Sequence, residues 1–135
     1  MFSTKQFERL LRNGHNAEQG LIDKMDNFPV VLLRLSGVSP KAWLLASVNP
    51  SDQNQSFGLI SEANEDPSPG YVNLSGIKAL ASDQELKLYQ DPLFESADRR
   101  SLAEYHRDSI GEGQKILQFT EQVDHEELRD WIEDS

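Results

Sequence analysis

The chain has 135 residues, of which 23 are Asp or Glu and 13 are Lys or Arg, so its formal net charge is -10. This charge argues against a broad nucleic-acid-binding surface, because phosphate binding depends on Lys and Arg that displace condensed counterions. The lack of cysteine excludes disulfides, thiol nucleophiles and cysteine-ligated zinc sites. With 37% hydrophobic residues and its best apolar run confined to residues 28–33, the sequence predicts a soluble, cytoplasmic protein without a membrane span.

The first half of the chain predicts one helix and then a series of strands. Ser3 and Gln6 have the spacing of a capping box, and Asn13-Gly14 predicts a left-handed end to that helix, followed by a surface loop over residues 14–27. Because no helix separates the apolar runs that follow, they predict an antiparallel meander. The predicted strands are residues 30–35, 42–48, 57–60 and 71–74, with polar loops at 49–55 and 62–70.

The second half predicts a short helix around Ile77 and Leu80, an edge strand at residues 86–89, and a helix that begins after Ser101, where Glu104 completes a second capping box. Residues 115–120 fit a strand or a helix equally well, and Asp124 is a suitable N-cap for a last, amphipathic helix. The predicted fold class is therefore α+β, a mainly antiparallel sheet of about five strands with helices at both ends and after the fourth and fifth strands. Residues 1–120 form the predicted domain, and residues 121–135 form an acidic helix that either docks on it or projects.

Short motifs along the chain, in a fixed order, resemble those of a known family. They are Leu10-Leu11-Arg12-Asn13-Gly14, Pro29-Val30-Val31, Trp43-Leu44-Leu45, Phe57-Gly58-Leu59 and Gly70-Tyr71-Val72-Asn73-Leu74. In this order and spacing they are similar to a family of small proteins of unknown function carried by bacterial conjugative plasmids and integrative elements. The resemblance implies that the gene lies on a mobile element. Ser47 and Ser68 stand where the family has glutamates, so any chemistry of those glutamates is lost here, and the resemblance ends near Ile116.

Acidic side chains gather at the C-terminus. Residues 121–135 contain seven acids and one arginine, so they contribute -6 to the net charge of -10. On a helix these acids lie opposite Leu128, Trp131 and Ile132, and they form either a solvated face or a phosphate-like surface that binds a basic protein partner. If the apolar side were exposed, it would instead favour a homodimer. The predicted partner-binding residues are Glu62, Glu65, Asp66, Glu126, Glu127, Asp130, Glu133 and Asp134.

A second candidate site is a ligand pocket on the sheet, because strands can present aromatic side chains to a small molecule. Its alternative is ordinary core packing, the commoner role of an aromatic residue in an apolar strand. The predicted pocket residues are Trp43, Ser47, Phe57, Ser68 and Tyr71.

Catalytic and metal-binding patterns are weak. None of the three histidines has a second histidine or a carboxylate at the spacing of a helical metal site, so neither a metal nor a cofactor is predicted. His106 beside Tyr105 suggests a hydrolase only weakly, and three arginines, Arg99, Arg100 and Arg107, are few for direct nucleic-acid binding. The leading hypothesis is a non-enzymatic acidic protein-binding module that inhibits a host nucleic-acid-targeting defence protein. A small-molecule or peptide-binding domain is the alternative, and a hydrolase is the third.

Overall fold

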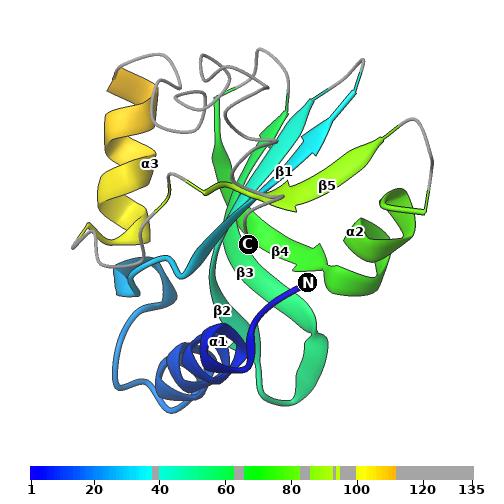
Figure 1. Ribbon diagram of the computed structural model, residues 1–135. Coiled ribbons are helices and arrows are strands. Elements are labelled where there is room, and N and C mark those ends of the chain that lie inside the picture. Colours follow the sequence, from blue (N-terminus) through cyan, green and yellow to red (C-terminus); the bar gives the residue numbers. More distant parts are fainter. Residues whose placement is uncertain (38–39, 63–65, 83–85, 93, 95–99, 112–135) are drawn as a thin grey trace.

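A five-stranded antiparallel sheet forms the centre of the computed structural model (Figure 1), which describes residues 1–37, 40–62, 66–82, 86–92, 94 and 100–111. The strands are β1 (Val31–Ser36), β2 (Lys41–Asn49), β3 (Asp52–Glu62), β4 (Ser68–Asn73) and β5 (Lys87–Gln90). The helices are α1 (Thr4–Glu18), the short 3-10 helix η1 (Lys24–Asp26), α2 (Leu74–Leu80) and α3 (Leu102–Gly111). The strand order β4-β3-β2-β1-β5 confirms the predicted meander of four strands with a fifth at an edge, and the fold class is α+β.

Helices cover both faces of the sheet. This explains why β1 and β2 carry apolar side chains on both of their faces. On one face, Leu33, Trp43 and Leu45 pack in a cluster that includes Leu10 of α1 and Ile77 of α2. On the other face, side chains of the same strands pack with α3 and with Met25 of η1. Figure 1 shows α3 and α2 on opposite sides of the sheet. This second cluster contains Leu32, Ala42, Leu44, Ala46, Phe57, Leu59, Leu102 and Tyr105.

The first helix begins as predicted but ends later. Ser3 Oγ accepts a hydrogen bond from Gln6 N at 3.1 Å, and Gln6 Oε1 accepts one from Ser3 N at 2.9 Å, which confirms the capping box. The predicted stop at Asn13-Gly14 is wrong, because α1 continues to Glu18. Gly14 serves as a contact point, since it is buried and its Cα lies against the backbone of Val48 in β2. The absence of a side chain at Gly14 permits this close approach, so the glycine does not act as a left-handed cap.

The predicted loop at residues 49–55 is also wrong. Asn49 pairs with Asp52, so only two residues form the turn and β3 begins in polar sequence. The polar strand residues near this end are mostly exposed, and the hairpin extends beyond the hydrophobic core. Between Leu45 and Ser47 the register of β2 against β3 shifts, which marks a β-bulge.

The elements after β4 follow the predicted order. Asn73 Oδ1 accepts a hydrogen bond from Gly76 N at 2.9 Å and caps α2, so Leu74 belongs to this helix and not to the preceding strand. Glu104 N donates to Ser101 Oγ at 3.2 Å, which confirms the second capping site, and Tyr105 is buried. Residues 115–120 and the predicted C-terminal helix lie outside the described residues. Within the described part of the chain, no helix is long and apolar enough to cross a membrane.

A buried ion pair joins β1 to the segment that follows β5. Arg34 Nε donates to Asp91 Oδ2 at 3.1 Å, and their side chains are only 5% and 1% exposed. Asp91 N also donates to Leu32 O at 2.8 Å, so both the backbone and the side chain of Asp91 are held against β1. This pair secures the edge of the sheet from which the chain leaves toward α3.

Candidate functional site

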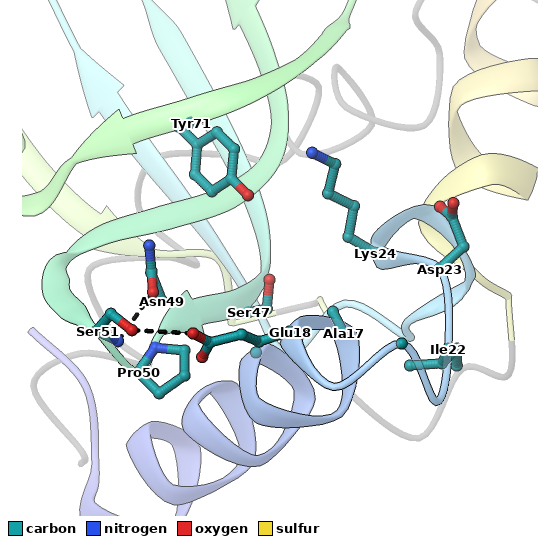
Figure 2. A pocket seen from close by; sticks show the side chains of 12 residues that line it. Ala17, Glu18, Ile22, Asp23, Lys24, Ser47, Asn49, Pro50, Ser51 and Tyr71 are labelled. Atoms are coloured by element: carbon teal, nitrogen blue, oxygen red, sulfur yellow. Dashed lines mark hydrogen bonds between the residues drawn. The ribbon is translucent and has the colours of Figure 1, made fainter.

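A cavity of about 770 Å3 opens where the last turn of α1, η1, the β2–β3 hairpin and β4 meet (Figure 2). This volume lies within the range of roughly 300–1,000 Å3 that is typical of small-molecule sites. The lining residues are Gly14, Ala17, Glu18, Gly20, Ile22, Asp23, Lys24, Ser47, Asn49, Pro50, Ser51 and Tyr71.

The continuation of α1 past Gly14 builds one wall of this cavity. It brings Glu18 beside the hairpin turn, where Ser51 Oγ donates to Glu18 Oε1 at 2.9 Å, as the dashed line in Figure 2 shows. The turn is held in place because Ser51 N donates to Asn49 Oδ1 at 2.9 Å. The wall therefore depends on a helix end and a tight turn that are joined by a hydrogen bond between side chains.

Ser47 supplies a buried hydroxyl at the floor of the cavity. It lies at the β-bulge of β2 and is only 4% exposed, and its carbonyl oxygen accepts a hydrogen bond from Ser56 Oγ at 2.7 Å. Its own hydroxyl has no hydrogen-bond partner among the protein groups around the cavity, and in Figure 2 it points toward the space between Tyr71 and Lys24. An unpaired buried hydroxyl costs about 1–3 kcal/mol, so a polar atom inside the cavity would stabilise this group.

Tyr71 and Lys24 form the opposite side of the cavity, and Phe57 lies beneath them. Phe57 and Tyr71 are cross-strand neighbours on β3 and β4, with ring centroids 5.1 Å apart and planes at 65°. Lys24 Nζ lies 4.9 Å from the Phe57 centroid and 5.0 Å from the Tyr71 centroid, within the range of a cation–π contact. Lys24 forms no ion pair with the part of the chain that the structure describes. Its ammonium is therefore held by the ring faces.

A family model for proteins of unknown function, DUF2958, matches residues 1–114 of the chain. The chain belongs to this family. The matched region contains every residue that lines the cavity, and it ends before the acidic segment at residues 121–135. Comparisons with curated proteins and with solved structures gave no match.

The structure of this DUF2958 domain separates the predicted pocket residues into three groups. Ser47 and Tyr71 line the cavity, and Phe57 is 5% exposed beneath Tyr71 and Lys24. Trp43 packs in the cluster on the opposite face of the sheet, next to α1 and α2. Ser68 is exposed and pairs with Ile60 at the far end of β4.

Sequence patterns alone missed the charged residues of the cavity. Glu18, Asp23 and Lys24 fall in residues 14–27, which were predicted to be a surface loop. The available signal was the spacing of Leu21, Ile22 and Met25 around the charged pair Asp23-Lys24, because apolar residues three and four positions apart indicate a helical turn.

The predicted acidic partner surface lies largely outside the described residues. Glu65 and the five acids at 126, 127, 130, 133 and 134 fall there, as do Leu128, Trp131 and Ile132. Of the others, Asp66 is exposed, and Glu62 Oε1 lies 3.5 Å from Lys41 Nζ in an exposed ion pair.

The remaining candidates for catalysis and metal binding lie apart from the cavity. His106 on α3 is half-buried, makes no hydrogen bond with the described part of the chain and does not line the cavity. His15 shares a hydrogen bond of 2.9 Å with Gln19 on the surface of α1. The described residues contain no group of three or more His, Asp or Glu side chains that could hold a metal ion.

Proposed function

We propose that this protein is a small-molecule or peptide-binding domain whose ligand occupies the cavity between α1, η1 and β4. The proposal rests on the buried hydroxyl of Ser47, which has no hydrogen-bond partner among the residues that the structure describes. A ligand atom at hydrogen-bonding distance would remove the cost of leaving this hydroxyl unpaired. The cavity of about 770 Å3 is much larger than the roughly 30 Å3 that one water molecule takes up in the liquid, so it has room for an organic ligand.

A thermal-shift screen of small metabolites and short peptides tests this proposal, because a compound that binds only the native state raises the Tm by mass action. We expect Ser47→Ala to weaken the binding of the hits by about tenfold, the effect of one hydrogen bond of about 1.4 kcal/mol. The same substitution should leave the free energy of unfolding unchanged or slightly higher, since it removes an unpaired polar group.

Ser56→Ala is the matched control for this screen. Ser56 is fully buried and its hydroxyl already donates to Ser47 O, so its loss should lower the free energy of unfolding by about 1–3 kcal/mol while the cavity hydroxyl is retained. The proposal fails if no compound stabilises the parent protein, or if Ser47→Ala binds every hit as tightly as the parent does.

We propose as a second candidate that the protein is a non-enzymatic acidic binding module. On this hypothesis it acts in the cytoplasm, is encoded by a mobile element, and inhibits a host nucleic-acid-targeting protein through a phosphate-like surface. Its support is that residues 121–135, which follow the family-matched region 1–114, carry -6 of the net charge. In this proposal residues 1–120 are the domain and the acidic segment is a helix that docks on it or projects. A hydrolase that uses His106 gains no support from the contacts of that side chain.

The acidic proposal predicts a partner whose binding depends on salt. An affinity pull-down from the native cell extract should retain this partner at about 50 mM salt and lose it at about 300 mM, because screening shortens the range of charge attraction. Reversing Glu126, Asp130 and Glu133 to lysine should abolish retention at low salt without changing the Tm. The control variant E8K/D26K/D52K changes the net charge equally on exposed residues of the domain and should still bind. Equal retention of the two variants would refute the acidic proposal.

A further inference from the structure

The aromatic side of the cavity already holds a cation that belongs to the protein. Phe57 and Tyr71 meet at 65°, and Lys24 Nζ lies about equally far from both rings, at 4.9 and 5.0 Å. Two aromatic faces set at a steep angle form the kind of site that binds ammonium groups through the negative faces of the rings. Lys24 therefore has the position that the cationic group of a ligand would take.

The other charges around the cavity also favour a cation. Besides Lys24, the charged lining residues are Glu18 and Asp23, both carboxylates, so the lining without Lys24 carries two negative charges. Glu18 accepts a hydrogen bond from Ser51 Oγ, and Asp23 Oδ1 accepts one from Met25 N at 2.9 Å, which hold both carboxylates in place. An anionic ligand would meet these two carboxylates, whereas a cationic ligand would be attracted to them.

Lys24 can leave the rings without disturbing the fold. It is exposed, it stands on the three-residue η1, and it forms no ion pair with the described residues. Its side chain is long and flexible, so the ammonium can move into solvent while the backbone of η1 stays in place. Tyr71 is 51% exposed, so the ring face that Lys24 releases is open to a ligand.

We propose that Lys24 is a tethered competitor in a cation-binding site, and that the cavity takes a ligand with an ammonium or guanidinium group that displaces Lys24 from Phe57 and Tyr71. The hydroxyl of Ser47 then pairs with a polar group of the same ligand. This inference rests on the proposed ligand-binding function and specifies the chemistry of the ligand. The cation is carried either by a free small molecule or by a side chain of a peptide.

The test is an NMR titration of the 135-residue chain that follows the backbone amides of Lys24 and Tyr71. The probes are choline, its uncharged isostere 3,3-dimethyl-1-butanol, a blocked tripeptide with a central lysine, and inorganic phosphate. We expect Lys24→Ala to lower the Kd for a cationic probe by about fivefold, because the internal competitor is gone. Tyr71→Leu should raise that Kd by about fivefold, and Tyr71→Phe should preserve it. Lys78→Ala, which removes an exposed lysine of α2 outside the cavity lining, should have no effect.

The sign of the Lys24→Ala effect decides the outcome. Tighter binding of choline supports the inference with a small-molecule ligand, and tighter binding of the tripeptide supports it with a peptide ligand. If phosphate binds and Lys24→Ala abolishes that binding, or if the uncharged isostere binds as well as choline, the inference is wrong while the ligand-binding function stands. If neither these probes nor the thermal-shift library bind, both proposals fail.

Discussion

Replacing Gly14 with alanine should lower the free energy of unfolding by about 3 kcal/mol or more, at the upper end of the usual cost of overpacking. A Cβ at this position would overlap the carbonyl oxygen of Val48 and lie 2.8 Å from its carbonyl carbon. These are backbone atoms near the end of β2, the central strand of the sheet, so they cannot rotate away as a side chain would. Helix α1 must then move off β2, which separates Leu10 from its cluster and opens the cavity that Gly14 lines. Urea denaturation followed by far-UV circular dichroism measures the change.

Gly76→Ala is a control that should change the free energy of unfolding in the opposite direction. Gly76 lies inside α2, and the nearest atom to an added Cβ is 3.8 Å away, an ordinary contact distance. Its amide still donates to Asn73 Oδ1 after the substitution. Alanine is the better helix former by about 1 kcal/mol, so this variant should be more stable than the parent. A Gly14→Ala protein with the parent's stability would show that α1 does not approach β2 as closely as described.

Asp91→Ala should cost about 3–5 kcal/mol, because it removes a buried carboxylate that accepts a hydrogen bond from the buried guanidinium of Arg34. The two side chains are 5% and 1% exposed and lie 3.1 Å apart, so the ion pair is shielded from water in the native state. Equilibrium unfolding in urea at neutral pH measures this cost. We expect the segment after β5 to lose protection from hydrogen exchange first, since Asp91 holds it against β1.

A double-mutant cycle separates the ion pair from the packing of its side chains. The double variant R34M/D91A should lose about 1–3 kcal/mol less than the sum of the two single variants, because each single variant already loses the coupling between the two side chains and the sum counts it twice. Glu62→Ala is the matched control, since it removes an exposed pair with Lys41 and should cost less than about 1 kcal/mol. Additive single effects at Arg34 and Asp91 would contradict the proposed coupling.

Local patterns predicted those parts of the fold that depend on near neighbours in the chain. Ser3 with Gln6 and Ser101 with Glu104 satisfy backbone groups three residues away, so the starts of α1 and α3 were predictable. The apolar runs predicted the strands because a strand covered on both sides must be apolar on both faces. The same reasoning could not predict that Trp43 packs in the core while Tyr71 lines the cavity. The face that an aromatic residue occupies depends on the strand register and on which helix covers that face.

The sequence by itself determined that the chain forms an antiparallel meander with helices at its ends, because hydrophobic periodicity and capping residues act over short distances. Only the tertiary structure showed that Gly14 permits the close approach of α1 to β2. This role depends on the carbonyl of Val48, which lies more than thirty residues away in the sequence. The cavity was likewise decided by tertiary structure, since it combines Lys24 of η1, Ser47 of β2 and Tyr71 of β4. Contacts between distant segments produce no periodic pattern in the sequence. The proposed cation site could therefore be found only from the three-dimensional positions of Phe57, Tyr71, Lys24 and Ser47.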